Sequence, residues 1–340
     1  MSGLSSSRRR YGLALGLLAL GLLFSVTLGV CSGSSRIPLR KILEILFTSG
    51  GEAAQRSIVW KVRMPRVLLA ATLGGGLAVS GFLLQTFFHN PIAGPFVLGI
   101  SSGAKMTVAA AMVFLVHRFQ GASSAVLVGA AFIGALLSTG VILLLSRQVR
   151  QMSVLLVAGI MIGYLCSAGT ELIIAFAADA DIVNLHNWSQ GSFSGADMEG
   201  VRFSLWLTGL TVGVVFLLSK PIGAFQLGES YAKSVGVNVR GIRVAVILLS
   251  SLLSACVAAF AGPISFVGVA IPFLVKRLLQ TSRPLQVTPA LFLAGAIACV
   301  AADWIARTCL APAELNVSTV TSILFAPVVL LMMLKKRERV

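Results

Sequence analysis

The sequence predicts an all-α integral membrane protein, a single domain over residues 1–340 with about ten membrane-spanning helices and both termini in the cytoplasm. Hydrophobic residues make up 57% of the chain and charged residues only 11%, whereas soluble domains carry roughly 25% charged residues. Apolar runs of about 20 residues recur along the chain, which is the length that crosses a ~30 Å hydrocarbon core as a helix. Helices are favoured in lipid because each pairs its own backbone N–H and C=O groups.

The apolar runs place the expected spans in order along the chain. Proline marks several of their ends, because it removes a backbone donor and cannot continue a helix beyond its first turn. The eighth run is short, since Gly262-Pro263 precedes it and Arg283-Pro284 follows it. The expected spans are 11–30, 64–87, 96–116, 122–145, 153–176, 203–218, 242–261, 266–279, 287–306 and 319–334.

Basic residues near the span ends predict the orientation, because Lys and Arg accumulate in cytoplasmic loops. Three arginines precede the first span and four basic residues follow the last, so both termini are expected inside. The loop at 31–62 breaks the pattern, since it is basic and yet is expected outside. Either the first span is misplaced or this loop uses its basic surface externally, and the agreement of the other loops favours the second interpretation.

The net charge of +16 alone would be compatible with nucleic-acid binding. The basic residues, however, lie in loops that flank the spans rather than on one folded face. Topology and anionic membrane lipid therefore explain the charge, and no nucleic-acid partner is expected. The first apolar run is about 20 residues long, which exceeds the roughly 7–15 residues of a signal-peptide core, so it is expected to remain as a helix.

No catalytic, metal-binding or nucleotide-binding motif is found in the sequence. The nearest fragment to a phosphate-binding loop, 99–105, is followed by Met106 where that motif requires Ser or Thr. The cysteines lack CxxC pairing, and the three histidines lack the spacing of a metal pair. The chain is therefore expected to be no enzyme, to hold no metal or other cofactor, and to take energy for uphill transport from a partner or an ion gradient.

Few ionisable residues lie within the expected spans, where a gradient-driven carrier would need them. Glu171 lies toward the outer end of the fifth span, and either a place on a translocation path or a structural role is open for it. Asp303 stands four residues before Arg307, a spacing that predicts an ion pair on one helix face. A gradient-driven secondary transporter is therefore a disfavoured alternative, as is a membrane-embedded enzyme, because His, Asp and Cys are not clustered.

Five motifs spread along the chain carry a family resemblance. They are RMPRVLLA from Arg63, SGFLLQTFFHNPIAGP from Ser80, LGISSGA from Leu98, AGPISFVGVAIP from Ala261 and LAPAEL from Leu310. In this order they resemble the FecCD family, the permease subunits of type II ATP-binding-cassette importers for iron chelates, haem and vitamin B12. The resemblance implies a homodimer in membrane lipid, two ATPase subunits on the cytoplasmic side, and a periplasmic or lipid-anchored substrate-binding protein outside.

The resemblance also implies roles for individual positions. The binding protein is expected to dock on Arg63, Arg66 and Arg307, whose planar guanidinium groups can hold carboxylates through two hydrogen bonds. The expected cytoplasmic gate comprises Asn90, Ile92, Gln151, Met152 and Ser153. The ATPase-coupling helices are expected within 220–241, at Leu227, Gly228, Glu229, Ala232, Val235 and Gly236. Possible pathway residues are Glu171 and Phe273, and Phe273 departs from the histidine that the family often has there.

The resemblance thus predicts a multi-pass permease of a prokaryotic inner (cytoplasmic) membrane. It would move an iron(III)-siderophore or related metal chelate inward by alternating access, driven by ATP hydrolysis on a partner subunit. Haem and cobalamin are alternative cargoes within the same family, because the departure at Phe273 puts the substrate in doubt rather than the family.

Overall fold

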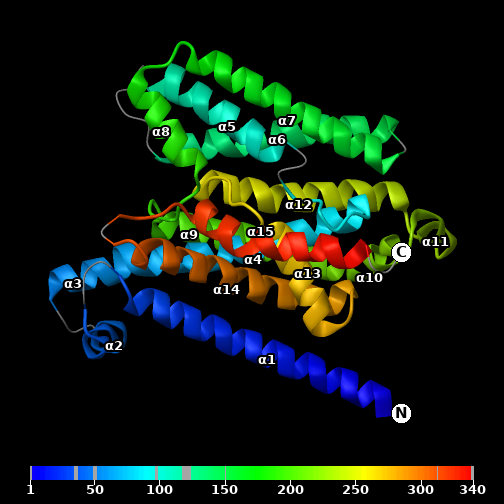
Figure 1. Ribbon diagram of the computed structural model, residues 1–340, viewed down its shortest axis with the longest axis horizontal. Helices are drawn as coiled ribbons and strands as arrows, with labels where there is room; N and C mark the ends of the chain where they lie inside the picture. Colours follow the sequence, from blue (N-terminus) through cyan, green and yellow to red (C-terminus); the bar gives the residue numbers. More distant parts are fainter. Residues whose placement is uncertain are drawn as a thin grey trace.

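The computed structural model describes residues 2–33, 37–48, 52–95, 99–116, 124–149, 151–311 and 313–337. All regular structure in these ranges is helical (Figure 1). The expected span ends at residues 96 and 122 and the basic residues at 36, 150 and 339 lie outside the described residues. The elements are α1 (Ser2–Cys31), α2 (Leu39–Phe47), α3 (Ala53–Ser57), η1 (Ile58–Arg63), α4 (Met64–Phe88), α5 (Ile100–Ala110), η3 (Ala111–Val116), α6 (Ser124–Gln148), α7 (Met152–Ile174), α8 (Asp179–Ser189), α9 (Met198–Leu217), α10 (Ser219–Gln226), α11 (Glu229–Ser234), α12 (Val239–Ala261), α13 (Val267–Leu279), α14 (Pro284–Thr308) and α15 (Val317–Arg337).

Among the described residues, eight helices are long and apolar enough to cross a membrane. The expected third span is shorter, at Ile100–Leu115. The expected eighth span is α13, whose 13 residues extend about 20 Å at 1.5 Å per residue, less than the ~30 Å core. The structure therefore confirms an all-helical membrane fold with a short eighth element, while the count of ten spans stays a prediction.

Helices occupy much of the segment expected as an external loop at 31–62, and its place outside the membrane stays a prediction. Its residues form α2 and α3, and α3 continues through η1 into α4, so a single rod runs from Ala53 to Phe88. Sequence reasoning began this span at Met64, since Arg56 and Lys61 interrupt the apolar run before it. Helix α8 lies in a segment for which no helix was predicted.

The two ends of the bundle differ in the short elements that they carry. Helix α1 begins and α15 ends at the end that also holds α10 and α11, which we call the inner end (Figure 1). Helices α2, α3 and α8 lie at the opposite, outer end. This arrangement agrees with both termini lying on one side, and the assignment of the inner end to the cytoplasm rests on the basic residues of the sequence.

Helix α4 lies at the centre of the bundle and is buried along almost its whole length. Helices α9, α12, α13 and α14 pack against it. A Cβ atom on Gly81 would collide with the backbone of Gly268 in α13, and one on Gly74 would collide with the backbone of Gly295 in α14. Glycines in α4 therefore permit close backbone approach to α13 and α14.

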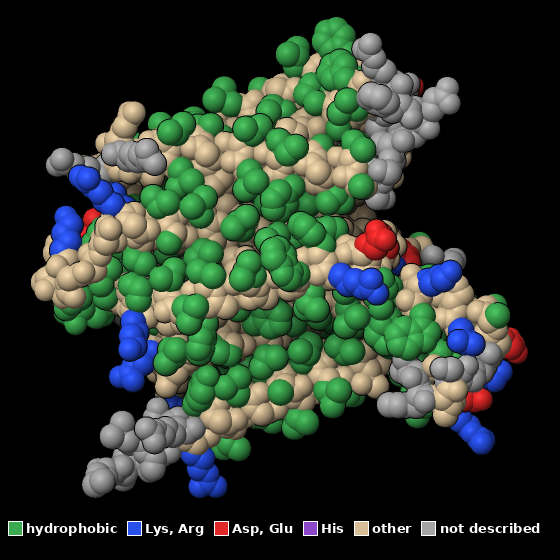
Figure 2. Space-filling view, turned by 180° about the vertical axis from the view of Figure 1, so that it is seen from behind, with side chains coloured by type: hydrophobic (Ala, Val, Ile, Leu, Met, Phe, Trp, Pro, Cys, Tyr) green, Lys and Arg blue, Asp and Glu red, His purple; other side chains and the backbone are tan. Residues whose placement is uncertain are grey.

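The surface of the bundle carries a broad apolar band. In the view from behind, apolar side chains cover the middle of the molecule, and the Lys, Arg, Asp and Glu side chains gather toward its two ends (Figure 2). Large apolar side chains such as Leu17, Leu137 and Trp206 are mostly exposed. A band of this kind is stable only against lipid or against another apolar surface.

Candidate functional sites at the two ends of the bundle

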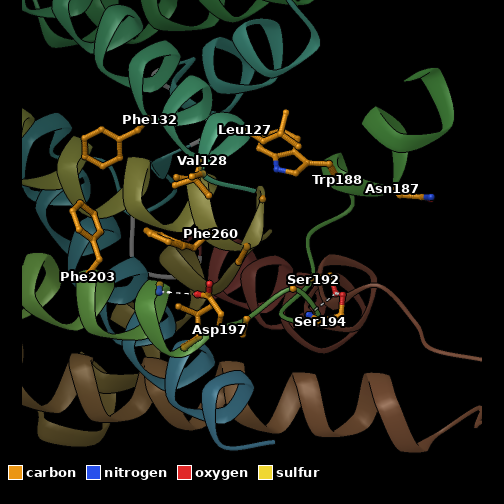
Figure 3. Close-up of a pocket in the computed structure, with 18 of the residues that line it drawn as sticks. Leu127, Val128, Phe132, Asn187, Trp188, Ser192, Ser194, Asp197, Phe203 and Phe260 are labelled. Carbon is orange, nitrogen blue, oxygen red and sulfur yellow. Dashed lines mark hydrogen bonds between the residues drawn. The ribbon is translucent and has the colours of Figure 1, made fainter. Parts of the chain in front are cut away.

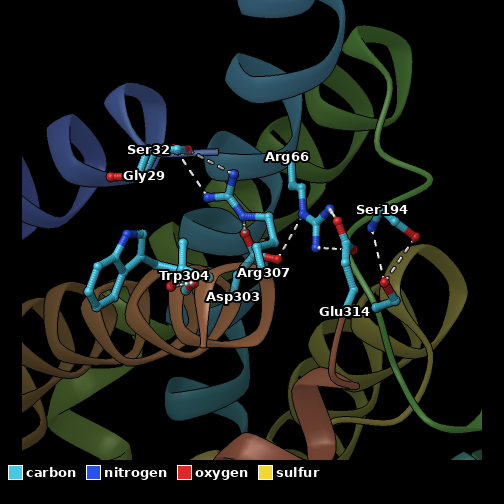
Figure 4. A network of polar contacts seen from close by, with 10 residues as sticks. Gly29, Ser32, Arg66, Ser194, Asp303, Trp304, Arg307 and Glu314 are labelled. Atoms are coloured by element: carbon cyan, nitrogen blue, oxygen red, sulfur yellow. Dashed lines mark hydrogen bonds and ion pairs between the residues drawn. The ribbon is translucent and has the colours of Figure 1, made fainter. Parts of the chain in front are cut away.

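A buried charge cluster joins α4, α14 and the segment before α15 at the outer end (Figure 4). Arg66 Nε donates to Asp303 Oδ1 at 2.8 Å. Arg307 Nε lies 3.1 Å from Asp303 Oδ2, at angles that make the contact an ion pair rather than a hydrogen bond. Asp303, 1% exposed, is thus held between two arginines, and the predicted pair of Asp303 with Arg307 is confirmed.

Arg63 and Arg307 hold the C-terminal end of α1. They donate hydrogen bonds of 2.9 to 3.3 Å to its last carbonyl groups. The acceptors are the carbonyl oxygens of Gly29, Val30, Cys31 and Ser32. The last carbonyls of a helix lack partners within the helix and carry the negative end of its dipole, so these cations fix α1 against α4 and α14.

Arg66 has a second carboxylate partner, which reaches the surface. Its Nη1 and Nη2 atoms each lie 3.1 Å from Glu314 Oε2. The Arg66 side chain is 7% exposed, whereas that of Glu314 is 47% exposed. A protein that approaches the outer end can therefore reach the partner of Arg66 before it reaches Arg66 itself.

Glu314 lies in a segment that is tied to other outer-end elements. Leu315 N donates to Ala306 O at 2.9 Å, and Val317 N donates to Gly191 O at 3.1 Å. Ser318 Oγ donates to Pro263 O at 2.6 Å, in the turn before α13. A movement of Glu314 would therefore also displace the start of α15 and the turn before α13.

At the inner end, α10 and α11 form where the sequence predicted cytoplasmic helices. Gly228 joins them at φ 110° and ψ 152°, and Gly236 follows α11 at φ 82°. Residues with a Cβ atom rarely adopt these conformations, so both turns require glycine. Arg243 Nε donates to Glu229 Oε1 at 2.7 Å, which fastens α11 to α12.

The exposed surface of this helical pair is partly apolar. Leu227 is 69% exposed and Val235 is 53% exposed, and Tyr231 lies on the same element. Ala232 is buried, and its carbonyl accepts a hydrogen bond from Val237 N at 2.9 Å. Of the expected coupling residues, Leu227 and Val235 can contact a partner through their side chains, and Ala232 supports the turn from beneath.

The expected gate turn after α4 contacts α10 directly. His89 has a left-handed backbone, φ 48°, and its Nε2 atom lies 3.3 Å from Phe225 O. Gln226 Nε2 donates to Thr86 Oγ1 at 3.0 Å. The turn that follows, at Asn90, is therefore coupled mechanically to the first short helix of the inner end.

Comparisons with known proteins give the family. The FecCD transport family matches this chain over residues 21–335, nearly its whole length. The chain belongs to the FecCD transport family. It is 34% identical over 342 residues to the hemin transport system permease protein HmuU of Yersinia pestis, covering 100% of this chain and 99% of that one.

Other FecCD permeases are about equally similar. The vitamin B12 import system permease protein BtuC of Klebsiella pneumoniae is 34% identical, over 95% of this chain and 93% of that one. The achromobactin transport system permease protein CbrC of Dickeya dadantii is 34% identical, over 95% and 92%. A metal-chelate type ABC transporter solved in an inward-facing conformation has a TM-score of 0.82 at 27% identity, covering 94% of this chain and 98% of that one.

The structure does not bring the expected gate and pathway residues together into one site among the described residues. Asn90 Oδ1 accepts a hydrogen bond of 3.0 Å from Ile92 N, which closes the turn and leaves Ile92 exposed. Gln151, Met152 and Ser153 lie at the start of α7, and no hydrogen bond or ion pair between described residues links them to that turn. Glu171 is exposed near the end of α7, and Phe273 is half-buried on α13 against α15. No role was predicted for Glu314 of the LAPAEL motif, which the structure brings to Arg66.

Proposed function

We propose that this chain is the permease subunit of an ATP-binding-cassette importer that carries a metal chelate inward across a prokaryotic inner (cytoplasmic) membrane. The observation that carries the proposal is the FecCD match over residues 21–335. An iron(III)-siderophore is the leading cargo. Relatives named for vitamin B12, hemin and achromobactin are each 34% identical, so cobalamin and haem are alternatives that sequence identity does not separate.

Energy would come from a partner that hydrolyses ATP and binds the inner end. Leu227 and Val235 supply exposed apolar contacts for it, while Gly228 and Gly236 shape the two turns. Movement of α10 would reach the Asn90 turn through Phe225 and Gln226. A homodimer with its path on the two-fold axis would bring two such turns together as a cytoplasmic gate, with the start of α7 beside them.

The outer end would receive a substrate-binding protein through Arg66. A carboxylate of that protein would replace Glu314, whose side chain is half exposed. Arg63 and Arg307 would support docking by fixing α1 beside Arg66, since their hydrogen bonds go to α1 carbonyls. Arginine suits this exchange because its planar guanidinium group can donate the same pair of hydrogen bonds to a different carboxylate.

A gradient-driven transporter is the alternative from another class. Such a carrier needs an intramembrane carboxylate that can take up and release a proton or ion. Asp303 is held between Arg66 and Arg307, which is a structural role. Glu171 is exposed on α7, where homodimer formation would decide its surroundings.

The proposal is tested by substrate-stimulated ATP hydrolysis in liposomes. The chain is co-expressed with the ATPase and the substrate-binding protein that are encoded beside it. Ferric siderophores, haem and cobalamin are then added in turn. Stimulation by one ligand, lost when the binding protein is omitted, is the expected result and identifies the cargo. Failure to form a complex with any such ATPase, with uptake that follows a proton gradient, would overturn the proposal.

A further inference from the structure

A large cavity opens at the outer end, beside Glu314 of the charge cluster. It has a volume of about 990 Å³ and lies between α6, α9 and α12 (Figure 3). None of its described lining residues belongs to α7, α13 or α15. In Figure 1 helix α15 faces the viewer. Seen from behind, the molecule has a notch between its upper layer and the rest (Figure 2). Acidic and basic side chains lie on the lower lip of this notch.

The deep walls of the cavity are apolar and largely aromatic. Phe132 on α6, Phe203 on α9 and Phe260 on α12 face the same space (Figure 3). The rings of Phe203 and Phe260 have centroids 5.8 Å apart. At 1.5 Å rise per residue, the lining residue Ile133 lies about 14 Å below the start of α6, and half of a ~30 Å hydrocarbon core is about 15 Å. With the start of α6 placed at the outer membrane surface, as the sequence predicts, the apolar part of the cavity matches the outer half of the hydrocarbon layer in depth.

The rim of the cavity is acidic, against the charge balance of the chain. Asp197, Glu199 and Glu314 line it, and no Lys, Arg or His is among the described lining residues. Glu314 is already paired with Arg66, so Asp197 and Glu199 are the carboxylates that remain for a ligand. The whole chain has 27 basic and 11 acidic residues, so two neighbouring carboxylates without a lining cation depart from the overall excess of positive charge. Asp197 Oδ1 accepts from Gly200 N at 2.7 Å at the start of α9. Glu199 is exposed and forms no ion pair with a described residue. Arg202, also exposed, lies one turn further along α9, outside the described lining of the cavity.

We propose that this cavity binds one amine-bearing phospholipid of the outer leaflet, of the phosphatidylethanolamine class. Its acyl chains would lie against the aromatic walls, where burial of apolar surface is favourable. Its ammonium group would donate hydrogen bonds to Asp197 and Glu199, and its phosphate would lie toward Arg202. A choline headgroup has no N–H to donate, and a glycerol headgroup lacks the positive charge, so both fit the acidic rim less well.

The bound lipid would fill the space between α6 and α9, to which α7, α13 and α15 contribute no described lining residue. The occupant is inferred from three features together, which are the depth of the apolar walls, the acidic rim and the arginine one turn along α9. A second copy of the chain and a soluble amine are the competing occupants that the experiment must separate.

A cavity-filling variant tests the site. Gly129 lines the cavity, and a Cβ atom there would meet nothing within 4 Å. Gly140 on the same helix is equally open and does not line the cavity. The full-length chain and the variants Gly129→Phe and Gly140→Phe are reconstituted with equal amounts of ethanolamine, choline and glycerol phospholipids, and retained lipid is counted by native mass spectrometry. We expect the parent and Gly140→Phe to retain the ethanolamine lipid preferentially and Gly129→Phe to retain about tenfold less of it.

A charge variant tests the headgroup. In the double variant Asp197→Asn with Glu199→Gln, the asparagine still caps α9, so the helix start is preserved. The preference for ethanolamine over choline lipid should fall about tenfold, because a charged hydrogen bond is lost, while total lipid retention stays the same.

Four results would overturn the lipid proposal. The parent chain could retain all three lipids equally, or Gly129→Phe could behave as Gly140→Phe does. Soluble glycerophosphoethanolamine could displace the lipid at equal concentration, which would make the ligand a soluble amine. Gly129→Phe could instead change the oligomeric state in light scattering with lipid retention unchanged, which would make the cavity an interface with a second copy.

Discussion

The two ends of the bundle use charged and apolar residues in opposite ways. At the outer end, Arg66, Asp303 and Arg307 are buried and already paired with one another. At the inner end, Leu227 and Val235 are exposed, and the Glu229–Arg243 pair is only partly buried. A partner that binds Arg66 must therefore replace an existing contact, whereas a partner that binds α10 and α11 can cover a surface that is already exposed.

The largest expected effect comes from breaking the outer cluster. Asp303→Asn leaves two arginines without their shared carboxylate inside the bundle, and removing one member of a buried ion pair costs about 3–5 kcal/mol. We expect much less folded protein after heating, measured by fluorescence-detected size exclusion. Glu44→Gln, which removes an exposed carboxylate on α2 at the same end, is the control and should leave the profile unchanged. An unaltered melting temperature for Asp303→Asn would show that the cluster does not stabilise the fold.

Binding of the ATPase at the inner end should depend on the backbone conformation of the α10–α11 turn more than on charged side chains. Gly228→Ala places a Cβ atom at φ 110° and ψ 152°, a region that costs of order 1–3 kcal/mol for other residues. We expect the α10–α11 turn to change shape and less ATPase to be retained on the purified permease. Gly223→Ala in the middle of α10 is the matched control, because a Cβ atom there makes only ordinary contacts. Equal ATPase retention by the two variants would argue against this turn as the coupling surface.

An exposed apolar side chain at the inner end should affect association without affecting stability. Leu227→Ala removes a side chain that is 69% exposed, and truncation of an interface anchor costs more than about 1 kcal/mol, which is at least about fivefold in Kd. The affinity for the ATPase, measured by biolayer interferometry, should fall by that factor while the melting temperature is unchanged. Leu137→Ala, exposed on α6 within the apolar band, should leave the affinity unaltered; an equal loss in both variants would make the effect non-specific.

The smallest expected effect sharpens the idea of contact exchange. Glu314→Gln removes the competing carboxylate from Arg66, and a half-exposed ion pair contributes less than about 1 kcal/mol to stability. The melting temperature should barely change, while the binding protein should bind about three- to fivefold more tightly because nothing charged has to leave Arg66. Glu52→Gln, an exposed acidic residue outside the cluster, is the control. Weaker or unchanged docking in Glu314→Gln would contradict the exchange.

Several features were predictable because they depend on local sequence. The spans that became α6, α7 and α12 follow from long apolar runs, and the short α13 follows from the prolines around it. The extension of α4 back to Ala53 was missed because its basic residues interrupt the hydropathy signal. Helix α8 was missed because its polar residues resemble those of a loop. Hydropathy marks where lipid lies, and it is a weak guide to helices outside the membrane.

The candidate sites were predictable only in part. The motifs pointed to Arg63, Arg66 and Arg307, but the pairing of Arg66 with Glu314 joins residues 248 positions apart. The contact between the Asn90 turn and α10 likewise joins His89 to a residue 136 positions away. Neither separation leaves a local pattern that one sequence can reveal.

The sequence by itself determined the solvent, the helical class and the family, because transfer into lipid sums over each run of about 20 residues and needs no knowledge of its neighbours. Tertiary structure decided which charges meet, which side chains stay exposed for a partner, and where a cavity remains between α6 and α9. Those outcomes depend on how distant helices pack, because an ion pair or a cavity exists only once its walls have been brought together.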